Sequence, residues 1–283
     1  MKNYKLKNSV CVIWLLLLVI HSNGFAQSVK NIENSGSPSL LKTVSGDFLH
    51  VFSSPFKISK KGGIQLAALS AITTLFIAEL DGRIDEEFGR EGDHLALQPA
   101  DGLAEIGDVY DRVSTPLFFA GLTGVMFTGG FAFKDQKLLE TTRLMVESFV
   151  ITQIFTISIK GIVGRARPFT NRGASDFNFF KFSSSDDFRS MPSGHTSAIF
   201  SMMSVIAKQY PQWWVKLPAY TLATSVALQR MDSRSHWGAD VIIGATLGYW
   251  VGNSLVNHQN NKPDKFSFHP YLNGAKAGFA VQF

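Results

Sequence analysis

Residues 143–162 read RLMVESFVITQIFTISIKGI, and the twelve positions from Ser148 to Ile159 carry no charge. A helix that crosses a membrane needs about 20 mainly apolar residues, so this run fits either a membrane span or a helix buried in a protein core. Five other stretches on either side of it are apolar over lengths typical of helices. The six predicted helical segments are 62–80, 113–133, 143–162, 194–209, 213–229 and 237–256.

These segments predict an all-α fold, a bundle of about six helices that occupies residues 61–257. Residues 27–60 are expected to form an irregular or amphipathic N-terminal segment, with irregular chain over 27–45 and an amphipathic stretch over 46–58. The tail at 258–283 has a different pattern. An Asn273-Gly274 turn signal and alternating apolar residues at Phe279, Val281 and Phe283 predict a short β-hairpin-like structure there.

The first 26 residues have the pattern of an export signal. Three lysines precede an apolar run from Val10 to Ile20, and the small residues Gly24 and Ala26 precede a cleavage site before Gln27. We therefore expect a signal peptide at 1–26 and export to the cell envelope; an uncleaved N-terminal anchor is the alternative. Cleavage would remove Cys11, the only cysteine, which fits an oxidising compartment.

Composition excludes several classes of protein. Charged residues make up 17% and hydrophobic residues 45%, which rules out a disordered chain. Without residues 1–26 the chain carries 24 basic and 22 acidic residues, and this near balance gives no support for nucleic-acid binding. Ten acids fall between Asp81 and Arg112 without the ligand spacing of a calcium loop, so this stretch is predicted to be a solvated loop.

Three polar clusters lie at ends of the predicted helices. Residues 160–168, KGIVGRARP, close the third helix; residues 192–195, PSGH, open the fourth; residues 230–240, RMDSRSHWGAD, join the fifth to the sixth. If successive helices alternate in direction, all three clusters meet at one end of the bundle. That end is the predicted active site.

Each cluster also has a purely structural interpretation. Cations at a helix C-terminus complement its dipole, a Pro-Ser pair can cap a helix, and His236 with Asp240 can form an i,i+4 pair. Capping does not require three cationic groups, two histidines and an aspartate on one face, so the combination favours a functional site.

The chemistry that uses this combination is phosphoryl transfer. Fixed cations bind a phosphate dianion, and the backbone at Gly194 lets N–H groups approach it at a helix N-terminus. One imidazole can attack phosphorus while another protonates the leaving oxygen, and Asp240 can fix the tautomer of His236. The cations would take the place of a metal, so no metal is expected.

The three clusters resemble the motifs Lys-x6-Arg-Pro, Pro-Ser-Gly-His and Ser-Arg-x5-His-x3-Asp of the type 2 phosphatidic acid phosphatase/vanadium haloperoxidase superfamily, and in particular its bacterial envelope phosphatases. All three occur in order, with Gln229 in place of the usual Ser. The resemblance implies no cofactor. It implies that His236 is the nucleophile, His195 the general acid and Asp240 the residue that orients His236. It assigns phosphate binding to Lys160, Arg167, Ser193, Gly194 and Arg230, and leaves Arg165 and Arg234 without a role.

The function expected from these residues is a metal-independent phosphatase that hydrolyses phosphomonoesters or pyrophosphates, lipid phosphates above all, through a phosphohistidine. A vanadium-dependent haloperoxidase and a non-catalytic phospholipid-binding membrane protein are the alternatives. Signals for topology conflict: six spans after a cleaved signal place the site in the cytoplasm, whereas the positive-inside rule places it outside. We expect membrane association, a site that faces the periplasm, and a phosphate-bearing lipid or small molecule as partner.

Overall fold

The computed structural model describes residues 40–88, 98–180, 182, 185–261, 267–273 and 276–282. Helices dominate these ranges, which confirms the predicted all-α class. The predicted signal peptide at 1–26 lies outside the described part of the chain.

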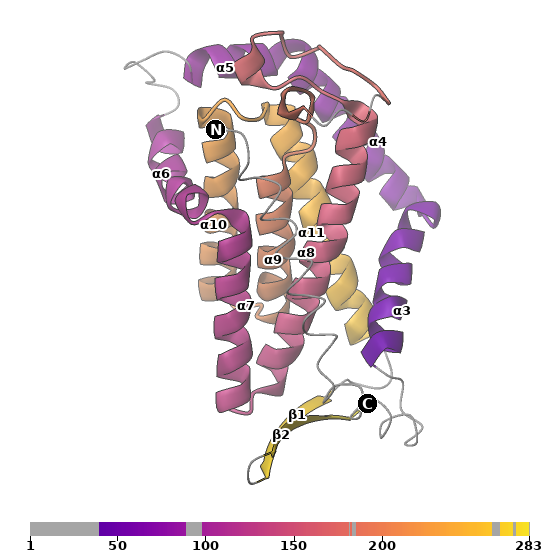
Figure 1. Ribbon diagram of the computed structural model, residues 1–283. Helices are drawn as coiled ribbons and strands as arrows, with labels where there is room; N and C mark the ends of the chain where they lie inside the picture. The colour runs from indigo at the N-terminus through magenta and orange to yellow at the C-terminus, as the bar shows by residue number, and fades with distance from the viewer. Residues whose placement is uncertain are drawn as a thin grey trace.

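Long helices run side by side and form the body of the molecule (Figure 1). The central helix, α9, packs against α8, α10 and α11, while α7 covers the outer side of α8. Fully buried apolar side chains such as Leu144, Ile199 and Leu255 join these helices into one core. The bounds are Thr115–Ala132 for α7, Gln136–Val163 for α8, Gly194–Gln209 for α9, Trp213–Asp232 for α10 and Gly238–Asn260 for α11.

The contact between α9 and α11 is a close approach of two backbones. Gly244, Gly248 and Gly252 recur every fourth residue on α11, and a Cβ atom at Gly248 would lie 2.4 Å from the carbonyl oxygen of Ser197 in α9. Small residues at this spacing let two helices approach until their backbones touch. This contact brings the start of α9 against the start of α11, where two of the predicted motifs lie.

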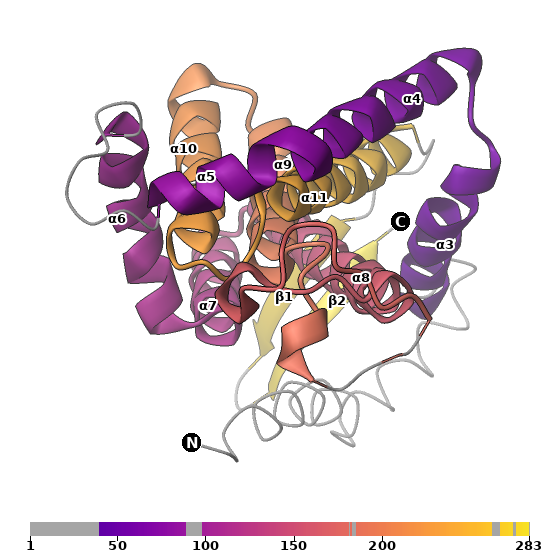
Figure 2. The same cartoon turned by 90° about the horizontal axis from the view of Figure 1, so that it is seen from above.

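The N-terminal helices lie around this body. α3 (Leu40–Ser53) packs against α8 and α11, and α6 (Gln98–Val113) packs against α10. α4 (Lys60–Leu75), the π-helical turn η3 (Phe76–Leu80) and α5 (Asp81–Phe88) follow one another without a break. Seen from above, α4 and α5 cross the ends of the long helices (Figure 2).

Among the residues that the structure describes, three helices are long and apolar enough to cross a membrane: Lys60–Phe88, Thr115–Ala132 and Gln136–Val163. On the first of them the apolar side chains point away from the protein, since Ile64, Leu66, Ile72 and Leu75 are all exposed. Exposed apolar surface of this extent marks contact with lipid or another apolar partner. Together these features indicate that the chain associates with a membrane.

The prediction of a solvated loop over residues 81–112 is wrong. Residues 81–88 belong to α5 and residues 98–113 to α6. The physical reason is that several of the acidic side chains pair with cations of the protein: Asp81 binds Arg165, Asp85 binds Arg234 and Asp111 binds Arg230.

Smaller differences concern the helix limits. Residues 40–45, predicted irregular, form the start of α3. Helix α8 begins at Gln136, seven residues before the predicted 143, because Asp135 caps it by accepting a hydrogen bond from the backbone N–H of Leu138 at 3.0 Å. The charges of Arg143 and Glu147 are accommodated inside α8 because they bind each other.

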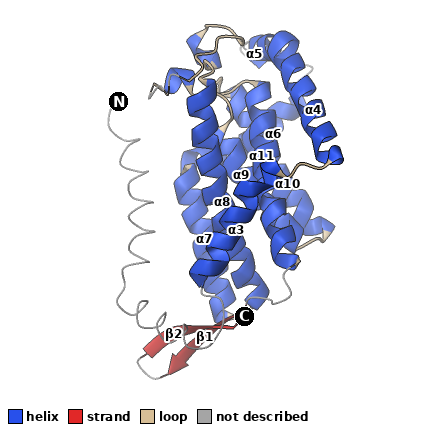
Figure 3. Cartoon of the chain, turned by 90° about the vertical axis from the view of Figure 1, so that its right-hand side faces the viewer, coloured by secondary structure: helices blue, strands red, loops and turns tan. Residues whose placement is uncertain are grey.

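The connection from α8 to α9 folds over the end of the bundle through two short 3₁₀ turns, Pro168–Thr170 and Asp186–Phe188. At the opposite end, β1 (Ser267–Asn273) pairs antiparallel with β2 (Lys276–Gln282), as expected for the C-terminal tail. Figure 3 shows these strands below an otherwise helical chain.

Candidate active site

Four helix ends meet at one end of the bundle, as alternation of helix direction predicts. The backbone N–H of Ser193, before α9, donates to the carbonyl oxygen of Asp240 in the first turn of α11 at 3.0 Å. Lys160, in the last turn of α8, donates to the carbonyl oxygen of Ser190 at 3.0 Å. The backbone N–H of His236 donates to the carbonyl oxygen of Arg230, at the end of α10, at 3.0 Å. The three motifs therefore share one site.

His236 lies in the short connection between α10 and α11 and is 3% exposed. Its Nδ1 lies 3.8 Å from Oδ2 of Asp240 and 3.5 Å from Oγ of Ser190. The Ser190 hydroxyl also donates to Oδ2 of Asp240, and the backbone N–H of Trp237 donates to the same oxygen at 3.0 Å. The carboxylate thus faces Nδ1, which leaves Nε2 as the ring nitrogen on the far side, where a nucleophile would act.

Burial lowers the pKa of the His236 imidazole well below its ordinary value, although the hydrogen bond with Asp240 opposes this shift. The positive charges of Lys160 and Arg167 lower this pKa further. His236 is therefore neutral near pH 7, which is the form of imidazole that can attack an electrophile.

His195 lies in the first turn of α9, with about a third of its side chain exposed. Burial is the largest factor that lowers the pKa of His195, followed by the charge of Arg230; Lys160 and Arg167 act in the same direction. Its Nε2 is 3.9 Å from Oδ1 of Asp111, and its ring stands edge-on to Tyr110. All three predicted phosphate-binding cations thus act on one imidazole, which places them around a common space.

Backbone carbonyl groups and a carboxylate of neighbouring segments hold two of these cations in place. Arg167 donates from Nε to the carbonyl oxygen of Asp186 at 2.9 Å, and from Nη1 to the carbonyl oxygen of Ser235 at 3.3 Å. Burial lowers the pKa of Arg167. Arg230 is 6% exposed and forms an ion pair at 2.8 Å with Asp111 of α6. Such a group of buried and half-buried cations has the chemistry to bind an anion.

The start of α9 lies beside these cations. Ser193 is the N-cap: its Oγ accepts a hydrogen bond from the hydroxyl of Thr196 at 2.9 Å and a longer one from the Thr196 backbone N–H. A Cβ atom at Gly194 would lie 3.8 Å from Cε of Lys160, so the backbone at this glycine directly adjoins the lysine. The prediction that Ser193 caps the helix is confirmed. Because its oxygen accepts both of these hydrogen bonds, its hydroxyl proton can be donated to an anion at the same helix N-terminus.

The predictions from sequence missed residues of α6. Asp111 binds Arg230, and Asp108 accepts a hydrogen bond at 2.9 Å from the side chain of Gln229. Gln229, which departs from the family motif, accepts in turn from Nε of Arg230 at 2.6 Å. The amphipathic spacing of Ile106, Val109, Tyr110 and Val113 could have identified this helix, but no local signal pairs its acids with residues 118 or more positions later.

Arg165, left without a role by the motifs, is fully buried in this structure. It bonds to Asp240 and to Asp81. Arg234 binds Asp85 of α5 at 2.6 Å. Within the described ranges, no three His, Cys, Asp or Glu side chains are grouped so as to hold a metal ion.

Comparisons with known proteins find similar sequences. The model of the PAP2 superfamily matches residues 142–264. The lipid A 1-phosphatase of Rhizobium johnstonii is 29% identical over 147 residues, which cover 47% of this chain and 55% of that protein. The chain therefore spans about half the length of this curated relative.

Two solved structures are also similar. The crystal structure of LpxE from Aquifex aeolicus is 20% identical, with a TM-score of 0.44, and covers 63% of this chain and 95% of its own. The second is the crystal structure of the first transmembrane PAP2 type phosphatidylglycerolphosphate phosphatase from Bacillus subtilis. It is 18% identical, with a TM-score of 0.45, and covers 70% of this chain and 97% of its own. All three motifs lie inside residues 142–264, and this part of the chain is similar to the PAP2 superfamily.

Proposed function

We propose that this protein is a phosphatase for lipid phosphates that works through a phosphohistidine on His236. The observation that carries the proposal is the meeting of two histidines and three buried or half-buried cations at one end of the bundle. The match of residues 142–264 to the PAP2 superfamily and similarity to a lipid A 1-phosphatase support the same reaction class.

The proposed reaction has two steps. The phosphate binds Lys160, Arg167 and Arg230, with the backbone and hydroxyl at Ser193–Gly194 as further donors. Nε2 of His236 then attacks phosphorus, the bond from phosphorus to the leaving oxygen breaks, and His195 gives its proton to that oxygen.

In the second step, His195, now neutral, takes a proton from water as the water oxygen attacks the phosphohistidine. The nitrogen–phosphorus bond breaks, inorganic phosphate leaves, and His236 returns to its neutral state. Throughout the cycle Asp240 faces Nδ1 of His236 and stabilises the positive charge that develops on the imidazole.

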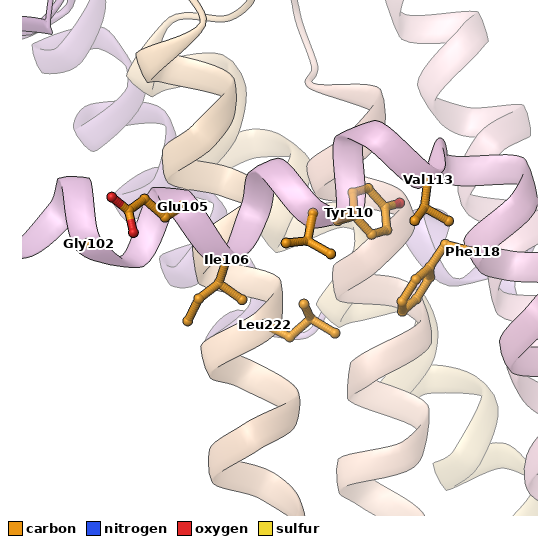
Figure 4. A pocket seen from close by; sticks show the side chains of 8 residues that line it. Gly102, Glu105, Ile106, Tyr110, Val113, Phe118 and Leu222 are labelled. Atoms are coloured by element: carbon orange, nitrogen blue, oxygen red, sulfur yellow. The ribbon is translucent and has the colours of Figure 1, made fainter.

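A lipid substrate is favoured by the surface beside His195. A pocket of about 420 Å³ lies between α6, α7 and α10, and apolar side chains line most of it (Figure 4). Tyr110 lines this pocket and also contacts the ring of His195, so an apolar group in the pocket would adjoin the phosphate site. The lining residues are Gly102, Glu105, Ile106, Val109, Tyr110, Val113, Phe118 and Leu222.

Phosphate release by the purified protein in detergent tests this function. We expect hydrolysis of phosphatidic acid or of lipid A that survives EDTA, is inhibited by vanadate and disappears in the His236→Ala variant. Acid-labile, base-stable phosphate on the wild-type protein would identify the phosphohistidine. Absence of release from every lipid phosphate would contradict the function, and complete loss in EDTA with rescue by a divalent metal would contradict metal independence.

We further propose that the protein is exported and that its site faces the periplasm. Single cysteines at Ser175, near the site, and at Gln136, at the opposite end, would be introduced into a Cys11→Ser chain. A maleimide that cannot cross the inner membrane would label Ser175→Cys alone if the bundle spans the membrane with the site outside, and both if the bundle is wholly exported. Labelling of Gln136→Cys alone would place the site in the cytoplasm.

A further inference from the structure

Behind His236 lies a chain of buried charges that reaches into the N-terminal part of the protein. Oδ1 of Asp240 accepts a hydrogen bond from Nη1 of Arg165 at 2.7 Å, and Oδ2 of Asp81 accepts one from Nη2 of Arg165, also at 2.7 Å. All three side chains are inaccessible to solvent. One guanidinium therefore joins the carboxylate that faces the histidine to a second carboxylate from α5.

Arg165 is held on every side. Its Nε and Nη2 donate to the carbonyl oxygen of Ala174 at 2.9 and 2.7 Å. The rings of Phe177 and Trp237 each lie 5.4 Å from its guanidinium carbon. Because its hydrogen bonds point in fixed directions, the planar guanidinium can set the orientation of the Asp240 carboxylate.

The position of Asp81 at the start of α5 directs its side chain toward Arg165. It follows directly after the π-helical turn η3, and such turns inside α-helices occur frequently at functional sites. Its Oδ1 accepts a hydrogen bond from the backbone N–H of Ala239 at 3.0 Å, in the first turn of α11. A Cβ atom at Gly238 would lie 3.1 Å from that oxygen, so a glycine there permits the approach. Asp81 thus fixes both Arg165 and the turn that carries Asp240.

We propose that Asp81 and Arg165 are positioning residues that act on His236 through Asp240, an inference that rests on the proposed function. Asp81 balances the charge of Arg165. The negative charge of Asp240 therefore remains available to stabilise the positive charge that develops on the imidazole. Asp81 lies outside the residues 142–264 that match the family, and neither role follows from the three motifs.

The test compares Asp81→Asn with Asp85→Asn in the full-length protein. Both changes remove a carboxylate from α5 that binds an arginine, but Asp85 pairs with Arg234, which does not contact Asp240. We expect Asp81→Asn to lower kcat by about 10- to 100-fold with little change in KM, the size of loss seen when a residue that orients a metal ligand is replaced. Asp85→Asn should keep the wild-type kcat.

Arg165→Lys keeps the positive charge but cannot bridge two carboxylates with a planar fork. We expect it to lower kcat as well, and the double variant with Asp81→Asn should be no slower than the slower single variant, because both changes break one chain. If Arg165→Lys fails to fold, the comparison of kcat between Asp81→Asn and Asp85→Asn still tests the proposal. Equal kcat for these two variants would overturn the proposal.

A second measurement does not depend on turnover. Nitrogen-15 NMR of histidine-labelled protein, with the His236 signals assigned from the His236→Asn variant, reports which ring nitrogen carries the proton. We expect Nδ1–H in the wild type and a larger share of Nε2–H in Asp81→Asn, while Asp85→Asn resembles the wild type. An unchanged tautomer in Asp81→Asn would overturn the positioning role. If the tautomer changes in Asp81→Asn but the wild-type protein shows no turnover, only the phosphatase function is contradicted.

Discussion

Two arginines in this protein, Arg165 just after α8 and Arg143 in its N-terminal half, each bind two buried carboxylates. At the active-site end, Arg165 joins Asp81 to Asp240. Nearer the other end, Nη1 of Arg143 bonds to Asp47 of α3 at 3.0 Å and to Glu147 at 2.7 Å. The residue types and the distances are almost the same.

In each group a carboxylate also lies beside a histidine, since Oδ1 of Asp47 is 3.6 Å from Nε2 of His258. The two groups differ in the cations around that histidine and in the hydrogen bonds of the arginine, because the charges of Lys160 and Arg167 act on His236. Asp240 faces His236, and Arg165 uses Nε, Nη1 and Nη2 in hydrogen bonds. Around Arg143, both carboxylates bond to the same nitrogen, and Oε2 of Glu147 accepts no hydrogen bond from the described residues. We infer that the first group sets the rate of the reaction, whereas the second ties α3 to the bundle. The chemistry of an ion pair alone does not reveal which of the two purposes it serves.

The largest expected effect comes from matched amide substitutions in the two groups. Asp240→Asn should lower kcat by about 10⁴-fold, as the corresponding change does in a Ser-His-Asp triad, because the amide cannot hold the imidazole in the same tautomer. Glu147→Gln should leave turnover per folded molecule at the wild-type level. Steady-state kinetics of both variants provide the measurement, and equal losses would show that the two groups do not differ in purpose.

His195→Ala should come next. The loss of a general acid lowers the rate by roughly 10²- to 10⁴-fold, and the loss should be greatest for alkyl phosphates, whose leaving oxygen needs the proton most. With p-nitrophenyl phosphate the variant should be much less impaired. If the rates with both substrates decrease by the same factor, His195 contributes to binding and not to proton transfer.

At the other end of α8, Asp47→Asn should act on stability. Breaking a buried ion pair by removing one partner costs about 3–5 kcal/mol. Thermal unfolding in detergent should show the decrease, and limited proteolysis should cleave near α3 sooner than in the wild type. Turnover of the remaining folded protein should be normal; a large decrease in kcat would mean that this group also serves the site.

A smaller effect concerns pH. Burial and Arg230 lower the pKa of His195 in the empty site, so this imidazole is neutral there near pH 7. A bound anion adds negative charge and raises that pKa, so binding takes up a proton and becomes tighter as the pH falls, by at most about tenfold per pH unit. The dissociation constant of vanadate would be measured from pH 5 to 8 for the wild type and for His195→Ala. Dividing one constant by the other removes the pH effects common to both proteins and leaves the effect of the proton on His195. A ratio independent of pH would contradict the assignment.

The smallest effect is expected at an exposed ion pair on the connection from α8 to α9. Arg172 and Asp176 lie 3.8 Å apart and Arg172 is more than half exposed. Arg172→Ala should change the free energy of unfolding by less than about 1 kcal/mol, the range of exposed pairs. A loss comparable to that of Asp47→Asn would mean that burial does not separate structural from surface ion pairs in this protein.

The sequence predicted the bundle and the eight motif residues because both rest on local patterns: apolar runs for the helices, short spacings for the motifs. It did not predict α6, since acidic residues at Asp108 and Asp111 suggested solvent where the structure has ion pairs. Nor could it connect Asp81 to Arg165, because those residues lie 84 positions apart and meet only when α5 crosses the bundle. Pairings between distant charges depend on the packed structure and leave no periodic signal.

The contact between α9 and α11 has a consequence for hydrogen exchange. The amide of Ser193 is fully buried and bonds to Asp240 across that contact, where Gly244 would admit no larger residue without displacing the Ser193 backbone. No loop movement can expose this amide; the two helices must separate first. Its deuterium uptake would therefore follow unfolding of the helix pair as a whole, and among amides at the site it would be one of the slowest to exchange.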